Sequence, residues 1–326
     1  MLAGDTQKWL QAEINDDFKC HLNKVIVSFV ANTPDRYFEL IGSGFIIAAL
    51  ERYALVMTAA HNFHYAGTIQ KPRHLHHSST LPEFQVHRGE TCSVDKDKMR
   101  AIYLSDQNAD LCIINGVSIV PELDIALCLI ELQENYNGQN FTYKLDIDSR
   151  PPRIGDKIAS IGYLGMKIEA QEISIEKQSS FFRMKRKIEL RHGRVTGVYN
   201  TGLRQIKWPC FETTIPIVGG MSGGPVVTMG APNSGISVCG VISKDFSPEE
   251  SFNNFSIPGQ SIMAMIWPSV YLPFRREFND SDDTKESNII DLIETGIIND
   301  LGEAHKNTKH KTNENTLRIS RIDQKK

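Results

Sequence analysis

The stretch Gly219-Gly220-Met221-Ser222-Gly223-Gly224-Pro225 carries one serine on a glycine-rich turn, and Val226-Val227 follows it directly. Because glycine has no side chain, the backbone N–H groups around such a serine can point into one small volume beside its hydroxyl. That is the layout of a nucleophile next to an oxyanion hole. A glycine-rich hairpin turn has the same local sequence, so the rest of the chain has to distinguish the two interpretations.

The chain around this turn predicts an all-β body. Apolar runs of strand length recur from Lys24 to Phe274, with few helical patterns between them, which is typical of a sandwich or of barrels. Ahead of this body, residues 1–23 predict a short amphipathic helix, because their large apolar side chains recur at helical spacing.

Beyond residue 274 the composition changes. Seven isoleucines and leucines between 289 and 301 lie at helical spacing and predict an amphipathic helix. Residues 303–326 hold seven Lys or Arg against three Asp or Glu, with almost no core-forming side chains. Such a segment buries too little apolar surface to fold, so a disordered basic tail is predicted. The expected domains are therefore 1–23, 24–273 and 274–326.

Composition limits the classes of partner. The 326 residues are 40% hydrophobic and 23% charged, with a formal net charge of -3 and a pI of about 6.4. With so small a net charge, the protein has no overall electrostatic attraction to nucleic acid or to an acidic membrane. The first residues lack the apolar run of a signal peptide, and no apolar stretch of roughly 18 residues or more predicts a membrane span.

The cysteines indicate a compartment. They are scattered, with no CxxC pair and no dense framework, and two of them lie inside apolar runs, where a buried free thiol is the default. We therefore expect a reducing, cytoplasmic compartment. The six are Cys20, Cys92, Cys112, Cys128, Cys210 and Cys239.

Two residues upstream of the serine have the chemistry that a serine nucleophile needs. His61 follows Thr58-Ala59-Ala60 at the end of an apolar run, and small residues there let an imidazole be held against the backbone as a positioned base. Asp124 stands directly before the run Ile125–Ile130, where a carboxylate is costly unless it is paired. Asp110 precedes a similar run and is the rival acid.

Three separated segments together resemble the trypsin-like (chymotrypsin-fold) serine peptidases. They match that family's histidine, aspartate and serine motifs in the family's order, as Thr58-Ala59-Ala60-His61, Asp124-Ile125-Ala126-Leu127 and Gly220-Met221-Ser222-Gly223-Gly224-Pro225. The resemblance covers about residues 24–273. It implies two six-stranded antiparallel barrels, divided near 140–150, with the active site in the cleft between them.

The resemblance also implies the role of each residue. Ser222 would be the nucleophile, His61 the general base and Asp124 the group that orients the imidazole. The N–H groups of Gly220 and Ser222 would form the oxyanion hole, and no cofactor or metal is needed.

Two further segments are similar to the HtrA kind of trypsin-like peptidase. Gly42-Ser43-Gly44-Phe45-Ile46 looks like a strand of the first barrel, and residues 155–163 look like the strand that opens the second. The second match favours Asp124 over Asp110, because Asp124 stands at the expected distance ahead of it. About 50 residues follow the barrels, fewer than a PDZ domain requires, so none is expected.

The sequence departs from the secreted members of that family at two places. Asn62 follows His61, where those enzymes usually have a disulfide, and Met221 stands where they carry an aspartate that pairs with a new N-terminus after cleavage. Activation by that ion pair is therefore not expected. Activity is expected to be controlled instead by a change that orders residues 216–221. Either an activating protein partner or the insertion at 164–192 would bring about this ordering.

The substrate is expected to be a protein or peptide, with a dedicated target as a further hypothesis. The resemblance places the pocket just before the serine and just after the run Gly240-Val241-Ile242. No acid stands at Pro216, which weighs against Lys or Arg at P1, whereas an acid near the rim would favour a cation. The candidate pocket residues are Thr214, Pro216, Ser243 and Asp245.

Neither of the two insertions in the barrels, residues 62–100 and 164–192, is predicted to bind a ligand. Residues 164–192 predict a hairpin in which apolar and charged, mainly basic, side chains alternate, interpreted as a solvated strand face rather than a phosphate or acidic-partner site. Residues 62–100 predict a solvated loop rather than a zinc site, because their histidines lack a regular ligand spacing. These histidines are His64, His74, His76, His77 and His87.

Two other classes of function compete with a trypsin-like peptidase. The serine segment also satisfies G-x-S-x-G, the nucleophile turn of α/β-hydrolases, but that turn leads into a helix and precedes the acid and the histidine. Here a strand-forming pair follows, and His61 and Asp124 come first. The second alternative is a protease-like barrel kept as a catalytically silent interaction module.

Overall fold

The computed structural model describes most of the two predicted barrels and parts of the segments around them. Residues 1–20, where the sequence predicts a helix, lie outside the described residues. The described ranges are 21–32, 38–65, 83–87, 90–92, 94–95, 98–104, 109–120, 123–132, 140–174, 179–203, 206, 208–229, 236–245, 261–275, 286–312 and 316–321.

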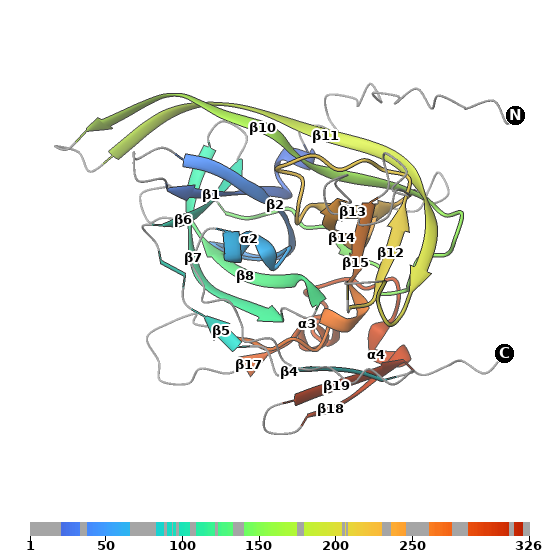
Figure 1. Cartoon of the computed structure of the whole chain (residues 1–326). Helices are drawn as coiled ribbons and strands as arrows, with labels where there is room; N and C mark the ends of the chain where they lie inside the picture. Colours follow the sequence, from blue (N-terminus) through green and yellow to red (C-terminus); the bar gives the residue numbers. More distant parts are fainter. Residues whose placement is uncertain are drawn as a thin grey trace, which may run out of the picture.

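The first barrel is a closed antiparallel sheet of six strands (Figure 1). The strands follow one another in the order β7-β6-β1-β2-β3-β8, and pairing of β7 with β8 closes the barrel, while β5 (Glu90–Cys92) adds to β7. The barrel strands are β1 (Ile26–Asn32), β2 (Phe38–Leu50), β3 (Tyr53–Thr58), β6 (Met99–Leu104), β7 (Ala109–Val120) and β8 (Ile125–Glu131).

The second barrel repeats this architecture. Its order is β13-β10-β11-β12-β15-β14, closed by pairing of β13 with β14, and β9 (Asp146–Ile147) joins β14 in parallel. The prediction of two six-stranded antiparallel barrels is confirmed. The strands are β10 (Lys157–Ser174), β11 (Ser179–Tyr199), β12 (Cys210–Thr213), β13 (Pro225–Thr228), β14 (Ser237–Asp245) and β15 (Ser261–Met265).

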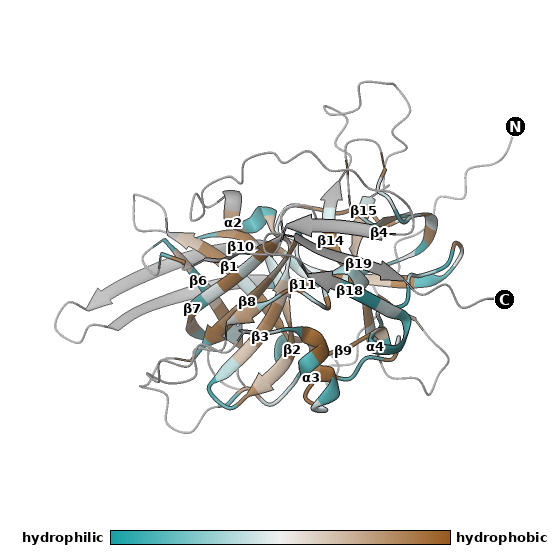
Figure 2. Cartoon of the chain, turned by 90° about the horizontal axis from the view of Figure 1, so that it is seen from below, coloured by the Kyte–Doolittle hydropathy of each residue, from teal (hydrophilic) through white to brown (hydrophobic). Residues whose placement is uncertain are grey.

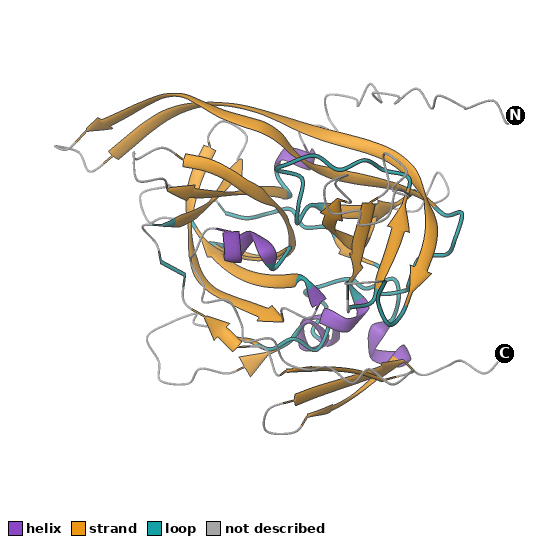
Figure 3. Cartoon of the chain, in the orientation of Figure 1, coloured by secondary structure: helices purple, strands orange, loops and turns teal. Residues whose placement is uncertain are grey.

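Strands β10 and β11 form a hairpin longer than the barrel. Their pairing runs from Lys157 opposite Arg194 to Ser174 opposite Ser179, and Figure 3 shows both strands continuing beyond the other barrel strands. The segment predicted as an inserted hairpin is therefore a continuation of two barrel strands.

No helix among the described residues is long and apolar enough to cross a membrane.

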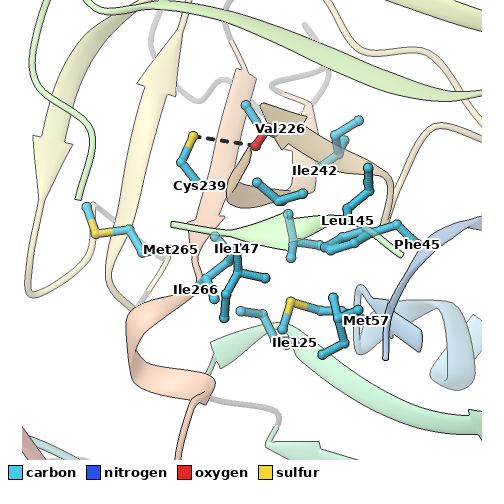
Figure 4. Packing of buried hydrophobic residues seen from close by; sticks show 14 of the residues in the cluster. Phe45, Met57, Ile125, Leu145, Ile147, Val226, Cys239, Ile242, Met265 and Ile266 are labelled. Carbon is cyan, nitrogen blue, oxygen red and sulfur yellow. Dashed lines mark hydrogen bonds between the residues drawn. The ribbon is translucent and has the colours of Figure 1, made fainter. Parts of the chain in front are cut away.

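One apolar core joins the two barrels. Phe45, Met57 and Ile125 of the first barrel lie in the same cluster as Val226 and Ile242 of the second (Figure 4). Each fully buried side chain of this size contributes about 1.5–3 kcal/mol to the free energy of unfolding. Figure 2 shows the hydrophobic segments along the barrel strands and hydrophilic ones in the outer loops. The barrels are thus packed against each other, with the connecting residues Leu145 and Ile147 in the shared core.

The four cysteines whose side chains are described are free and buried: Cys112, Cys128, Cys210 and Cys239. Burial raises the pKa of all four thiols, that of Cys210 to about 12. A thiol with so high a pKa carries little thiolate at neutral pH, and the thiolate is the reactive form. These cysteines therefore serve as small core residues.

The C-terminal segment differs from its prediction. Helix α3 (Ile289–Glu294) begins at a capping box of Asn288 with Asp291 and is much shorter than the predicted stripe, because Gly296 with φ 73° follows its C-cap Thr295. The tail predicted as disordered forms helix α4 (Ala304–Asn307) and strands β18 (Thr308–Thr312) and β19 (Thr316–Arg321). Short strands β16 (Phe274–Arg275) and β17 (Glu286–Ser287) and the 3-10 helix η2 (Trp267–Ser269) precede them.

A partner strand explains why the tail is ordered. Strand β19 pairs with β18 on one side and with β4 (Glu83–His87) on the other. The prediction of disorder considered only the apolar side chains of the tail itself. In the structure, β4 is a distant segment that supplies backbone hydrogen bonds to the tail. The same pairing makes part of the predicted loop at 62–100 a strand. Its histidines at 74, 76 and 77 lie outside the described residues.

Asp300 anchors this C-terminal segment to the second barrel. Its carboxylate accepts hydrogen bonds from the amide and hydroxyl of Ser149, at 2.9 and 2.7 Å, and from the amides of Gly302 and Ala304, at 2.9 and 2.6 Å. On either side of it, the amide of Ile147 donates to the carbonyl of Asn299, and the amide of Leu301 donates to the carbonyl of Ile147.

We expect Asp300→Ala to release this segment. The substitution leaves four donors without their acceptor, and an unmade hydrogen bond at a partly buried site costs about 1–3 kcal/mol. Limited proteolysis followed by mass spectrometry should show new cleavage between residues 296 and 312, with the barrels intact. Glu294→Ala, which removes an exposed carboxylate on α3, is the matched control. Equal protease resistance of both variants would contradict the anchoring role.

Candidate active site

The histidine and the candidate acid lie at adjoining strand ends. Strand β3 ends at Thr58, and helix α2 (His61–Tyr65) begins at the histidine. Asp124 directly precedes β8, which pairs antiparallel with β3 so that Thr58 lies opposite Ala126. The end of one strand and the start of the other therefore meet at the same edge of the barrel. Asp124 has φ 48°, a left-handed conformation that aspartate tolerates better than most residues.

Their side chains are in direct contact. His61 Nδ1 lies 3.0 Å from each carboxylate oxygen of Asp124, and the backbone amide of His61 donates to Oδ1 of Asp124 at 3.1 Å. A carboxylate accepts hydrogen bonds, so Nδ1 is the donor and the imidazole is held in one orientation. The exposed fractions are 42% for the His61 side chain and 9% for that of Asp124, so the ring faces the open side while the acid is enclosed.

A third group completes the surroundings of the acid. The hydroxyl of Ser243 on β14 donates to Asp124 Oδ2, so a residue of the second barrel supports an acid of the first. Asp110, the rival acid, lies buried on β7 opposite Tyr103. The histidine is hydrogen bonded to Asp124, so the structure brings together the pair that the sequence favoured.

The segment from Val218 to Gly224 forms two consecutive β-turns, and Ser222 lies in the second. The amide of Met221 donates to the carbonyl of Val218 at 3.1 Å, and the amide of Gly224 donates to the carbonyl of Met221 at 2.9 Å. The third residue of each turn is a glycine with positive φ, 94° at Gly220 and 85° at Gly223. A positive φ at that position is the mark of a type II turn, which favours glycine. Turn geometry therefore accounts for two glycines of the motif.

Packing between the barrels also requires one of these glycines. A Cβ on Gly223 would lie 2.1 Å from Thr58 Oγ1 and 2.2 Å from the carbonyl oxygen of Ser43, both in the first barrel. The amide of Gly223 donates to the carbonyl of Ile242 on β14 at 2.8 Å. The serine turn thus belongs to the second barrel and approaches the first more closely than any side chain would permit.

The backbone of Ser222 is tied to the residue next to the histidine. Its carbonyl accepts hydrogen bonds from the amide of Ser43 at 2.7 Å and from Nδ2 of Asn62 at 3.1 Å. Asn62 Nδ2 also donates to Thr58 Oγ1 at 3.0 Å, and Thr58 Oγ1 donates to the carbonyl of Ser43 at 2.6 Å. These contacts bring the serine loop alongside the histidine loop, and the side chain of Ser222 is half-buried there.

Sequence reasoning did not find this polar cluster of Ser43, Thr58 and Asn62. All three are fully buried or nearly so, at 0%, 0% and 1% exposure. In the sequence, Asn62 stands out only as the residue in place of a disulfide cysteine, and Ser43 only as part of a strand motif. A polar residue flanked by glycines or small residues in an apolar run was the one available signal.

Three of the four candidate pocket residues have described contacts, each with a different neighbour. Thr214 Oγ1 accepts from the amide of Arg194 at 3.0 Å, and the carbonyl of Pro216 accepts from the guanidinium of Arg191 at 2.7 Å. Arg191 also pairs with Glu189, so β11 holds the start of the serine loop. Ser243 contacts the acid, as described above, and the side chain of Asp245 lies outside the described residues.

Comparison with known proteins agrees with this geometry. The family model of the trypsin-like peptidase domain matches residues 42–231, more than half of the chain. The chain belongs to the trypsin-like peptidase family. The match includes the histidine, the aspartate and the serine segment, and it supports a serine-peptidase type of function. A search of curated proteins found no match.

Some trypsin-like peptidases have a disulfide that restrains the loop beside the catalytic histidine. In this protein Gly42 and Asn62 are in contact at the corresponding place. A Cβ on Gly42 would lie 2.4 Å from Asn62 Nδ2, and the three nearest atoms all belong to the Asn62 side chain. The space beside Gly42 is thus filled by the amide that donates to Ser222.

This contact predicts energetic coupling between positions 42 and 62. We expect Gly42→Ala to destabilise the protein by about 1–3 kcal/mol through overpacking, and to cost much less in an Asn62→Ala background, where the space is free. Urea unfolding of the four proteins measures the coupling. Gly219→Ala is the control, because a Cβ there has no neighbour within 4 Å. Additive effects at positions 42 and 62 would contradict the packing described.

Proposed function

We propose that the protein is a serine endopeptidase in which His61, Asp124 and Ser222 form the catalytic triad. The observation that carries the proposal is the pair of 3.0 Å contacts between His61 Nδ1 and the Asp124 carboxylate, next to a serine turn that is hydrogen bonded to Asn62. In this arrangement Nδ1 is engaged by the acid, which leaves Nε2 as the base for the serine hydroxyl.

The reaction has two stages. Ser222 Oγ attacks the carbonyl carbon of the scissile peptide bond while its proton passes to His61 Nε2. When the tetrahedral intermediate collapses, that proton goes to the leaving amine and an acyl ester remains on Ser222. Water then attacks the ester with His61 again as base, which releases the acid product and restores the serine. Asp124 stabilises the imidazolium that forms in each stage.

The amide N–H groups of Gly220 and Ser222 are proposed to bind the developing oxyanion. Turn geometry supports this role, because the amides of Met221, Gly223 and Gly224 are used in internal hydrogen bonds. Within the described part of the chain, the amides of Gly220 and Ser222 donate to no acceptor. Two such donors in a preorganised turn stabilise the transition state, and removal of one typically costs about 100- to 1,000-fold in rate.

We expect a fluorophosphonate probe to label wild-type protein at Ser222 and to leave Ser222→Ala unlabelled. Asp124→Asn should lower the labelling rate by orders of magnitude, about 10,000-fold in the best-studied triad, because the imidazole loses its orienting acceptor. Asp110→Asn, measured on folded protein, is the matched control and should label at close to the wild-type rate.

Two outcomes would count against the proposal. If Asp110→Asn abolishes labelling and Asp124→Asn does not, the acid is misassigned. If folded wild-type protein labels no faster than Ser222→Ala, with and without candidate partners, the chain is a catalytically silent module.

The proposed substrate is a protein or peptide bound beside Thr214 and Pro216, and the proposed specificity is for one dedicated target. The absence of an acid at Pro216 disfavours Lys or Arg at P1, so a P1 residue other than Lys or Arg is proposed. Digestion of a peptide library should then give a narrow set of cleaved sequences. Broad cleavage of unfolded protein, or cleavage mainly after Lys and Arg, would contradict this part of the proposal.

A further inference from the structure

We propose that the hydroxyl of Ser43 is a positioning group that sets the oxyanion turn formed by residues 218–221. The proposal rests on the function proposed above, because it concerns the same nucleophile loop. Ser43 does not touch the reacting atoms. It acts through the backbone carbonyl of Gly220, and it supplies a restraint that the activation ion pair supplies in family members with an acid at the position of Met221.

Ser43 lies on β2, fully buried, and its hydroxyl joins the two barrels. The amide of Tyr163 on β10 donates to Ser43 Oγ at 2.9 Å, and Ser43 Oγ donates to the carbonyl of Gly220 at 2.7 Å. An amide can only donate and a carbonyl can only accept, so the direction of both hydrogen bonds is determined. The one proton of the hydroxyl is therefore committed to Gly220.

This hydrogen bond fixes the orientation of the peptide that follows Gly220. A trans peptide is planar, with its C=O and N–H on opposite sides. Because the carbonyl of Gly220 faces Ser43, the N–H of Met221 faces the other way, where it donates to Val218. Rotation of this peptide would break both hydrogen bonds and open the turn that holds Gly220 at the φ of 94°, which sets the direction of its N–H.

The surroundings of Met221 explain why a polar restraint is needed. Its side chain is fully buried, and a Cβ on Gly162 would lie 2.8 Å from Met221 Cα. Methionine carries no charge and so cannot form an activating ion pair. A Cβ on Gly220 would meet Leu40 at 2.7 Å and the carbonyl of Tyr163 at 2.8 Å. Packing confines the turn, and Ser43 selects which way its peptide points.

Fluorophosphonate labelling kinetics test the proposal. For Ser43→Ala we expect the maximal labelling rate to fall about 10- to 100-fold, since misplacement of catalytic groups by about 1 Å has effects of this size. The pH at half-maximal rate should not move, because the Ser43 hydroxyl is hydrogen bonded to backbone groups of Tyr163 and Gly220, which do not titrate. Ser43→Thr, which keeps the hydroxyl, should recover most of the rate. If Ser43→Ala fails to fold, Ser43→Cys, with a weaker donor of similar size, takes its place.

Ser28→Ala is the matched control. Ser28 lies opposite Ser43 in the ladder of β1 and β2, is equally buried, and its hydroxyl has no hydrogen-bond partner among the described residues. We expect its labelling rate to equal that of wild type. Three outcomes would overturn the proposal. Ser43→Ala, or Ser43→Cys in its place, could label at the wild-type rate, or Ser28→Ala could lose as much rate as Ser43→Ala. The third is a loss of rate in Ser43→Ala that Ser43→Thr does not restore.

A second measurement separates this proposal from the proposed function. In a Ser222→Ala background, which has no nucleophile, Ser43→Ala should speed amide hydrogen exchange of the peptide spanning 216–224, and Ser28→Ala should not. If wild type never labels but this exchange rises, the peptidase proposal fails and the positioning of the turn stands. If wild type labels and the exchange is unchanged, the role assigned to Ser43 fails.

Discussion

The carbonyl of Ser222 carries the hydrogen bonds that align the histidine and serine loops of the two barrels. It belongs to a turn of the second barrel, and it accepts hydrogen bonds from the Ser43 amide and the Asn62 side chain of the first. Asn62 follows His61 in the chain, so this contact sets the spacing between histidine and serine. The hydroxyl of Ser243 makes the reverse connection, from the second barrel to Asp124. Two sets of hydrogen bonds, one in each direction, thus align groups from separate sheets.

Local pattern in the sequence predicted an all-β body, and the resemblance to trypsin-like peptidases added the two barrels and the histidine–aspartate pair. Apolar runs of strand length mark the strands, and positive-φ turns demand glycine whichever chain surrounds them. The glycines beside Ser222 are an example, since Gly220 and Gly223 each have a positive φ. Asp124 was preferred over Asp110 by its spacing from a second motif, and it is Asp124 that contacts His61.

The remaining features depend on contacts between distant segments, which no local pattern encodes. Asn62 and Ser222 are 160 residues apart, and Ser43 and Gly220 are 177 apart. The same limit explains the error at the C-terminus, where composition predicted disorder for residues 303–326 and β19 instead pairs with β4. The role given to Ser243 in the pocket stays a prediction, whereas its hydrogen bond to the acid was visible only in three dimensions.

The pairing of β4 with β19 has a consequence for how the chain is made. Translation proceeds from the N-terminus, and both barrels are complete by Met265, some fifty residues before β19 begins at Thr316. Strand β4 is therefore synthesised more than 200 residues before β19, the strand with which it pairs. An unpaired strand edge is a template for association with other chains. Synthesis of β19 thus ends the interval in which a nascent chain exposes this edge of β4.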